Sequence, residues 1–266
     1  MKKQFVFIGA CLAGLVLAVA ILTGRAGGQR SAASVRGAPE YLALGDSLTA
    51  GQGASDQGAT AFVPLLYAHL VQSVDGSFTL ANMGHNGDTS ATLISHGHLQ
   101  TAVDELRLRN ANATPEDDIR LVTVTIGAND VFAVAPVCAA GLTSECFDAV
   151  MAAFATVSTN LDFILGDLRA AAPDTTIVVM SYYNALINPG CSLNALAPLV
   201  DVLLEGGGPV TTGLNDIIRS AAASHGARVA ETVGLLDAAD MQPDCRHAND
   251  AGYQKIGAAF VRALDE

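Results

Sequence analysis

The stretch IRLVTVTIGAND, residues 119–130, is the clearest structural signal in the chain. Its first eight residues are apolar or β-branched almost without interruption, which predicts a strand buried on both faces. Such strands occur in parallel sheets that helices cover on both sides. Polar residues begin directly after the strand, at Asn129 and Asp130. The stretch therefore predicts an α/β fold with polar groups at the carboxyl end of a central strand.

The same alternation extends outward from this strand in both directions. Further short strands are predicted at residues 41–44, 78–83, 175–180 and 228–231. Longer helical patterns separate them, at residues 61–74, 99–108, 146–172, 193–204, 210–224 and 250–264. This alternation implies right-handed crossovers and a three-layer α/β/α fold around a five-stranded parallel sheet. We expect the flavodoxin-like strand order 2-1-3-4-5, which places a ligand-binding edge between strands 1 and 3.

The N-terminus carries an export signature. Two lysines precede an uncharged, mostly apolar run at residues 5–22, and small and polar residues follow. This pattern is typical of a signal peptide, but eighteen residues also reach the length of an uncleaved membrane anchor. We therefore divide the chain into an export signal or anchor at residues 1–26, a linker at 27–39 and a folded domain at 40–266. Either alternative places the domain in an extracytoplasmic space, secreted or anchored.

The charge balance limits the classes of partner. The chain has 14 Lys and Arg residues against 26 Asp and Glu residues, a net charge of −12. An acidic body repels nucleic acid and anionic headgroups, and no basic patch interrupts it. We expect no nucleic-acid partner, contact with a membrane only through the N-terminal segment, and a monomeric domain.

Cysteine usage agrees with export. Cys11 lies in the export segment, and Cys138, Cys146, Cys191 and Cys245 lie outside it. An even set in an oxidising compartment predicts disulfides, and four cysteines allow three pairings. Since Cys138 and Cys146 flank a short Gly-containing loop, we favour that bond together with one between Cys191 and Cys245. Unpaired buried thiols are the alternative, and no spacing matches a cysteine-based zinc site.

Four short polar motifs lie at predicted strand ends or before the last helix. They are GDSLTAG at 45–51, NMGHNGDTS at 82–90, GAND at 127–130 and DCRHAND at 244–250. Each is ordinary alone, because Ser, Asn and Asp cap helices and Gly and Asn form turns. Together they bring a Ser hydroxyl, an amide side chain and an Asp–His pair to one edge of the sheet. This combination indicates nucleophilic catalysis.

The four motifs resemble those of the GDSL lipases and esterases, also called SGNH hydrolases, over the whole folded body. The resemblance implies hydrolysis of carboxylic esters or thioesters with no metal and no cofactor. Matched position by position, Ser47 is the nucleophile, His247 the general base and Asp244 its partner. The oxyanion donors are then the backbone amides of Ser47 and Gly87 and the side chain of Asn129.

The second motif holds a rival for one of these roles. Gly84 is the alternative donor, but we prefer Gly87 because it stands directly before Asp88-Thr89, as in the resembling proteins. Asp88 and Asp130 are conspicuous carboxylates near the site. We expect both to brace its loops rather than to join the chemistry.

Three histidines, His85, His96 and His98, invite a metal interpretation. Because no carboxylate or cysteine is seen to complete a ligand set, we interpret them as solvated loop histidines and predict no metal site.

Three functions compete for this chain. The first is an esterase acting on short to medium acyl esters or lysolipids, and the second is a carbohydrate esterase that deacetylates polysaccharide. The third is a catalytically silent surface-binding protein, which the complete set of motifs disfavours. The loops expected to shape the pocket, residues 136–144 and 186–204, are moderately apolar, and the chain has no Trp to stack on sugars. We therefore favour small hydrophobic or lipid esters as substrates.

Overall fold

The structure is a computed structural model that describes residues 37–73, 78–138, 141 and 143–266. The predicted export segment and most of the predicted linker lie outside the described residues. Five parallel strands form one sheet in the order β2-β1-β3-β4-β5. They are β1 (Glu40–Gly45), β2 (Thr79–Gly84), β3 (Ile119–Thr125), β4 (Thr176–Met180) and β5 (Arg228–Ala230). The predicted fold class and strand order are confirmed.

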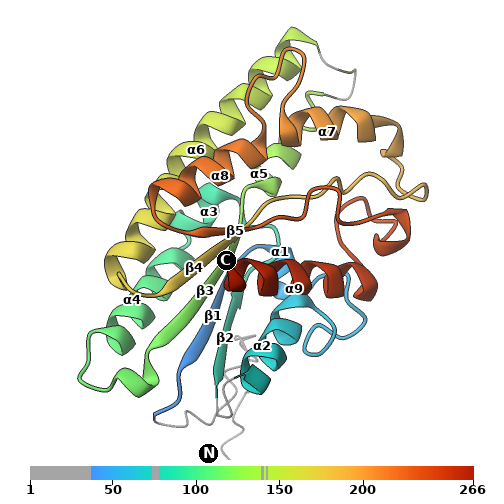
Figure 1. Cartoon of the computed structure of the whole chain (residues 1–266). Helices are drawn as coiled ribbons and strands as arrows, with labels where there is room; N and C mark the ends of the chain where they lie inside the picture. Colours follow the sequence, from blue (N-terminus) through green and yellow to red (C-terminus); the bar gives the residue numbers. More distant parts are fainter. Residues whose placement is uncertain (1–36, 74–77, 139–140, 142) are drawn as a thin grey trace, which may run out of the picture. The chain divides into compact units, whose positions relative to one another are not determined.

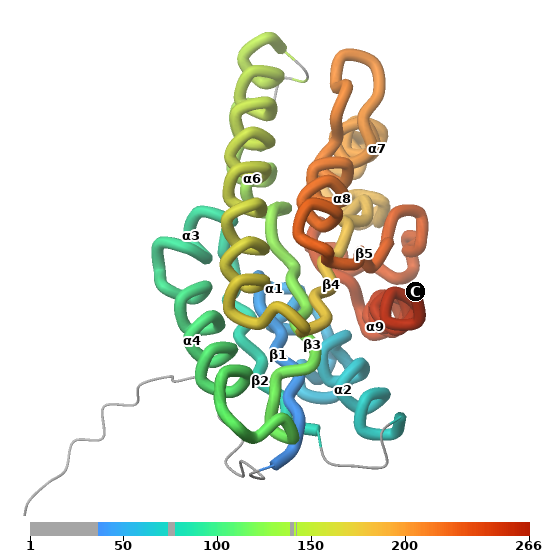
Figure 2. Tube along the Cα trace, turned by 60° about the vertical axis from the view of Figure 1, so that its left-hand side comes forward, coloured from blue at the N-terminus to red at the C-terminus, as the bar shows by residue number. Residues whose placement is uncertain are grey.

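Helices connect the strands and cover both faces of the sheet. The α-helices are α1 (Ser47–Ala50), α2 (Phe62–Ser73), α3 (Ser90–Ser95), α4 (His98–Asn110), α5 (Ala128–Phe132), α6 (Ser144–Ala171), α7 (Ala197–Glu205), α8 (Leu214–Ser224) and α9 (Asp250–Asp265). Three short 3₁₀ helices accompany them: η1 (Pro115–Asp117), η2 (Asn194–Leu196) and η3 (Ala238–Asp240). Figure 1 shows α4 and α6 on one side of the sheet and α2 and α9 on the other. The turned view of Figure 2 shows the same two layers.

The sheet is buried because both faces are covered. Every residue of β1 is buried, and in β3 only Arg120 is exposed. On the α2–α9 side, the ring of Phe62 stacks on the ring of Phe260 with 4.8 Å between centroids. The nearly continuous apolar runs of these strands therefore have a direct structural cause.

Helix α6 is long and apolar enough, by length and composition, to cross a membrane. Its buried residues nevertheless form one stripe at spacings of three and four, through Val150, Phe154, Val157 and Leu161. This helix lies against α3, α4 and α8. One apolar stripe on a packed helix is typical of an amphipathic core helix, so α6 belongs to the core of the domain.

Some element boundaries differ from the sequence prediction. The helix predicted at 210–224 begins only at Leu214, because Gly207 and Val210 form a tight turn in which the Gly207 amide donates to the Val210 carbonyl at 2.6 Å. The helix predicted at 193–204 is divided into η2 and α7. Helices α1, α3 and α5 were not predicted, since elements of four to six residues are too short to show an apolar period.

The carboxyl ends of β1 and β3 define the edge of the sheet where a ligand is expected to bind. These two strands pair directly, while β2 lies on the outer side of β1. Helix α1 begins just after β1, and α5 begins just after β3. The polar motifs that follow the two strands are therefore neighbours at a topological switch point, where ligands bind in folds of this class.

Candidate active site

The GDSLTAG motif forms a tight turn between β1 and α1. Gly45 has a φ of +151°, and a Cβ at this position would collide with the backbone of Thr125. Asp46 caps α1, and its carboxylate accepts a hydrogen bond from the Leu48 amide at 2.9 Å. Ser47 is the first residue of α1, so its own amide has no partner within the helix. The turn presents both the hydroxyl and the amide of Ser47 at the edge of the sheet.

Asp46 holds this turn from beneath, a role that the sequence interpretation did not assign. Its carboxylate also accepts hydrogen bonds from the Thr125 hydroxyl at 3.0 Å and the Tyr182 hydroxyl at 2.9 Å. Burial raises the pKa of Asp46 to about 6, although the bonds from Leu48, Tyr182 and Thr125 oppose that shift. The only sequence signal was its position directly before a helix, where Asp is a favoured cap. Tyr182 lies 136 residues from Asp46 in the sequence, and nothing in the sequence indicated their contact.

Ser47, His247 and Asp244 form a hydrogen-bonded chain. The Ser47 hydroxyl lies 2.9 Å from Nε2 of His247, and Nδ1 of His247 lies 2.5 Å from Oδ2 of Asp244. His247 is 9% exposed, so its ring lies mostly out of water. The structure therefore brings together the nucleophile, base and acid expected from the sequence, with the ring oriented by one nitrogen and in contact with Ser47 through the other.

Asp244 is held in its charged form. Its Oδ1 accepts from the backbone amides of His247 and Arg246, each at 3.0 Å. Partial burial opposes ionisation of Asp244, but the bond from the His247 ring and these two amides outweigh it and hold the pKa of Asp244 below its ordinary value. An ionised Asp244 stabilises positive charge on His247.

The turn that carries Asp244 and His247 is held by a backbone bridge and a disulfide. Before α9, Met241 and Ala248 form an antiparallel bridge. Within it the Gln242 amide donates to the His247 carbonyl at 2.8 Å. Cys245, inside the turn, has a φ of +64° and is bonded to Cys191. The bridge joins the two ends of the turn, and the disulfide ties its middle to Cys191.

The structure contains the two disulfides favoured from the sequence, Cys138–Cys146 and Cys191–Cys245. The first closes eight residues at the start of α6, and the second joins positions 54 apart. Only the second touches the Asp–His turn.

Gly84 and Gly87 differ in whether their amides are free. The Gly84 amide donates to the Asn82 side chain at 2.9 Å, and a Cβ on Gly84 would collide with the backbone of Ala50. Close packing explains that glycine. Gly87 has a φ of +82° and open space around it, and no acceptor for its amide is found among the described residues. Gly87 is therefore the better donor candidate, although it is not one of the residues that line the cavity beside Ser47.

Asn129 connects the second and third motifs. Its Nδ2 donates to the Asp88 carbonyl at 2.9 Å, which holds the amide beside the Gly87 turn. A carboxamide nitrogen carries two hydrogens, so one remains for a ligand at the cavity, which Asn129 lines. Asp130 points elsewhere and accepts from the amide and hydroxyl of Ser90 at 2.8 and 2.7 Å. Asp130 therefore ties α5 to α3, as a bracing residue would.

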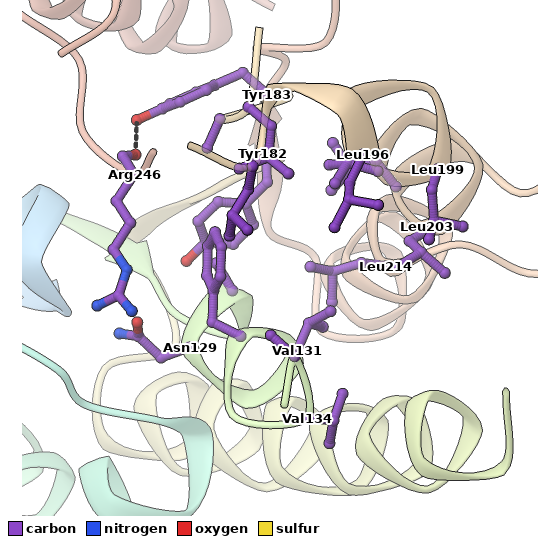
Figure 3. Close-up of a pocket in the computed structure, with 18 of the residues that line it drawn as sticks. Asn129, Val131, Val134, Tyr182, Tyr183, Leu196, Leu199, Leu203, Leu214 and Arg246 are labelled. Carbon is purple, nitrogen blue, oxygen red and sulfur yellow. Dashed lines mark hydrogen bonds between the residues drawn. The ribbon is translucent and has the colours of Figure 1, made fainter. Parts of the chain in front are cut away.

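A cavity of about 140 Å³ opens beside Ser47 and His247. Its walls are apolar, and Figure 3 shows side chains from three parts of the fold converging on it. They are Val131 and Val134 in and after α5, Leu196, Leu199 and Leu203 in η2 and α7, and Leu214 in α8. Of the two loops expected to shape the pocket, residues 186–204 supply much of the wall, whereas the described part of 136–144 supplies only Cys138.

Comparison with known proteins decides the family. The family model described as "GDSL-like Lipase/Acylhydrolase family" matches residues 43–255. The chain belongs to this family. The match includes all four polar motifs, and membership supports a hydrolase, most directly an ester hydrolase. No curated protein matches the chain.

Solved structures agree on the fold of this GDSL-family protein. A lipase, Lip_vut3, from a goat rumen metagenome has a TM-score of 0.64 at 16% identity and covers 85% of this chain and 97% of its own. Phospholipase A1 from Streptomyces albidoflavus has a TM-score of 0.57 at 22% identity, with 86% and 98% covered. An acetyl xylan esterase from Geobacillus stearothermophilus has a TM-score of 0.56 at 16% identity, with 85% and 94% covered. Both lipid and carbohydrate esterases thus share this fold.

A positively charged side chain, that of Arg246, lies at the mouth of the cavity in this GDSL-family protein. The sequence interpretation did not single it out. Arg246 lies between Asp244 and His247, and its guanidinium carbon is 5.3 Å from the centre of the Phe132 ring. The Tyr183 hydroxyl donates to the Arg246 carbonyl at 3.2 Å, which fixes its backbone. Figure 3 shows the guanidinium beside Asn129, on the side away from the leucines of η2, α7 and α8. No carboxylate pairs with the Arg246 side chain in the described part of the chain.

Proposed function

We propose that the protein is a serine esterase that cleaves carboxylic esters through an acyl-enzyme on Ser47. The observation that carries this proposal is the chain of contacts from Ser47 through His247 to Asp244, 2.9 and 2.5 Å long, at the mouth of an apolar cavity. Membership of a family of lipases and acylhydrolases supports the same reaction class.

The reaction proceeds in two halves. Ser47 Oγ attacks the ester carbonyl while His247 Nε2 takes its proton, and Asp244 stabilises the imidazolium. Collapse of the tetrahedral intermediate breaks the bond to the alcohol, which leaves with the proton from His247. Water then attacks the acyl-enzyme, with His247 as base, and releases the acid and free Ser47.

Three donors meet the negative charge that forms on the carbonyl oxygen. They are the backbone amides of Ser47 and Gly87 and the remaining Nδ2 hydrogen of Asn129. Because these groups are fixed before the substrate arrives, they stabilise the transition state without reorganising. Each such donor is typically worth about 2.7–4 kcal/mol.

The cavity favours hydrophobic acyl groups. Leu196, Leu199 and Leu203 face it from η2 and α7, and a substrate carbonyl at Ser47 would direct its acyl chain along them. Burying one methylene contributes about 0.8 kcal/mol, roughly fourfold in kcat/KM. This supports short to medium acyl esters over acetylated polysaccharide, which presents only an acetyl group.

Arg246 favours lysolipids among these esters. With the acyl chain in the cavity, the alcohol part of the ester lies toward the mouth, where the Arg246 guanidinium has no carboxylate partner among the described residues. Guanidinium groups match the geometry of phosphate oxygens. A lysophospholipid therefore suits both features, because its acyl chain would pack against the apolar wall and its phosphate would bind Arg246.

A panel of p-nitrophenyl esters beside acetylated xylan tests the acyl preference. We expect kcat/KM to rise by roughly fourfold per methylene until the cavity is filled. Leu199→Trp should remove that rise while leaving acetate hydrolysis within about threefold. Leu108→Trp is the control, since Leu108 is exposed and does not line the cavity. Preferred turnover of acetylated xylan, with no rise along the series, would favour the carbohydrate esterase.

A second pair of substrates tests the role of Arg246. Lysophosphatidylcholine and a monoacylglycerol with the same acyl chain differ at the phosphate. We expect Arg246→Gln to lower kcat/KM about tenfold for the lysolipid and less than about twofold for the glyceride, as for one charge-assisted hydrogen bond. Arg262→Gln, on α9, is the matched control. Equal losses of kcat/KM on both substrates would show that Arg246 does not bind the phosphate.

The proposed location is extracytoplasmic. Two disulfides fit an oxidising compartment. We propose that residues 1–26 export the domain, as a cleaved signal or as an anchor, and that the domain acts as a monomer.

A further inference from the structure

A second cluster of chemically active side chains lies behind the Gly87 turn. His85 follows β2, Asp88 closes the same turn, and His98 begins α4. Each offers a ligand atom, and the three atoms lie within 4.8 Å of one another. We rejected a metal interpretation of the histidines from the sequence because no carboxylate completed the set. The structure supplies that carboxylate as Asp88.

The rings of His85 and His98 stack with 3.5 Å between centroids and only 8° between planes. Two nitrogens that bind one tetrahedral ion at 2.0–2.1 Å are about 3.4 Å apart. The ligand atoms of His85, Asp88 and His98 lie within 4.8 Å of one another, so side-chain rotations alone would bring them to the spacing that an ion requires.

The His85 ring is oriented by a backbone oxygen, as in metal sites where a second contact fixes the ligand. Nδ1 of His85 lies 3.1 Å from the Met83 carbonyl, which leaves its Nε2 free. Nδ1 of His98 lies 2.6 Å from Oδ2 of Asp88. A bound ion would take the place of the proton between His98 and Asp88. His96, with Nδ1 3.9 Å from Asp88 Oδ1, stands next to this group.

Burial and charge also suit a cation. The Asp88 side chain is 6% exposed and the His98 side chain 21%, while His85 is exposed. The site is therefore anchored in the protein but open to solvent on one side. The chain carries a net charge of −12, which favours cations at its surface. Mixed imidazole and carboxylate ligands suit zinc better than magnesium or calcium, which prefer oxygen.

We infer that His85, Asp88 and His98 form a zinc site that fixes the Gly87 turn from behind. Gly87 lies between two of the ligands in sequence. The Asp88 amide donates to the His85 carbonyl at 3.2 Å, and the Asp88 carbonyl accepts from Asn129. An ion on the His85 and Asp88 side chains would therefore restrain both the Gly87 amide and the Asn129 carboxamide. The ion takes no part in the bond changes at Ser47.

Calorimetric titration of untagged, metal-free protein with Zn²⁺ tests the site. We expect one ion per chain, an affinity more than tenfold lower in His85→Ala, and a similar loss in His98→Gln. His85 is exposed, so its variant should keep the fold, and its melting temperature without metal checks this. His225→Gln is the matched control, because His225 also pairs with an aspartate, Asp162, at 2.7 Å. This control should bind as the wild type does, and Mg²⁺ should give no binding.

Hydrogen exchange locates the effect. Zinc should slow exchange in residues 84–98 of the wild type and leave it unchanged in His85→Ala. The same titration of Ser47→Ala separates this site from the proposed catalysis, since binding should persist there whatever the role of Ser47. No binding by the wild type, undiminished binding by His85→Ala, or lost binding in His225→Gln would overturn the zinc site.

Discussion

Two histidine–aspartate pairs, His247–Asp244 and His98–Asp88, make nearly the same contact. In His247–Asp244, Nδ1 lies 2.5 Å from the carboxylate, and in His98–Asp88 the distance is 2.6 Å. What differs is the next neighbour of each ring. Nε2 of His247 meets the Ser47 hydroxyl, whereas the ring of His98 meets the face of another imidazole.

The difference shows that an Asp–His contact does not define a function. In the proposed reaction Asp244 orients the ring of His247 through Nδ1, while the Ser47 hydroxyl lies at Nε2 and an apolar cavity lies beside both residues. Asp88 and His98 instead face His85, and the partner that we propose for this group is a cation. We propose that the same pair of residue types serves proton transfer in one place and metal binding in the other.

Replacing the two rings should produce the largest contrast. We expect His247→Ala to lower kcat by at least about 10⁴-fold, because the base and nucleophile act as one unit. His98→Ala, measured without metal, should lower kcat by less than tenfold, since that ring does not contact Ser47. Steady-state kinetics on one p-nitrophenyl ester measures both. Comparable losses in the two variants would mean that the pairs are not functionally distinct.

Replacing Asn129, which lies between the two pairs, should give the next largest loss of kcat. Asn129→Ala should lower kcat by about 10²–10³-fold with little change in KM, as expected for a donor that acts mainly in the transition state. Asn160→Ala is the control, because Asn160 is also a partly buried amide but donates to the Ser90 hydroxyl at 2.9 Å. A raised KM with normal kcat would instead make Asn129 a substrate-binding residue.

The His247 turn is joined to the body by a disulfide, and the His98 pair has no such link among the described residues. The double variant Cys191→Ala/Cys245→Ala should lose up to about 4 kcal/mol of stability and roughly tenfold in kcat. Cys138→Ala/Cys146→Ala, which opens a shorter loop away from the turn, should lose less of both. Thermal unfolding and kinetics measure the two effects. Full activity without the Cys191–Cys245 bond would refute its positioning role.

Asp46, beneath the Ser47 turn, should give the smallest effect. That effect is a change in how the free energy of unfolding depends on pH. Its pKa is about 6 in the fold and about 3.9 unfolded, so the folded chain holds more protons between those values. Its stabilising contribution is therefore complete below about pH 4 and is lost as pH rises through 6. Asp46→Asn does not titrate. Relative to the wild type, its free energy of unfolding should rise by roughly 1–3 kcal/mol from pH 4 to 7.

Urea unfolding of both proteins at several pH values measures this difference. The other titrating groups are common to the two proteins, so their contributions cancel in the difference. A difference that stays constant or falls with rising pH would contradict the raised pKa of Asp46.

Most of the fold could be predicted because its signals are local. The apolar runs of β1 and β3 and the stripe of α6 are visible in consecutive residues, and parallel topology follows from their alternation. The short helices α1, α3 and α5 could not be predicted, since four to six residues are too few for an apolar period to repeat. The late start of α8 depends on the turn through Gly207 and Val210, which competes with an otherwise helical pattern.

The site was predictable only where motifs carry it. Ser47, Asn129 and the Asp244–His247 turn lie in recognisable motifs, but the support of Tyr182 for Asp46 depends on residues far apart in the chain. The histidine cluster shows the same limit. Asp88 was noticed and the histidines were noticed, but their contact depends on how β2 and α4 are placed in space.

Labelling with a fluorophosphonate tests the central claim most directly, because the reagent forms a bond only with an activated nucleophile. Peptide mass mapping should locate one phosphonyl group, on Ser47, that is absent in Ser47→Ala and formed much more slowly in His247→Ala. Labelling in His98→Ala should proceed at nearly the wild-type rate. No label on Ser47, or a label that forms equally fast without His247, would contradict the assignment of this pair as the catalytic one.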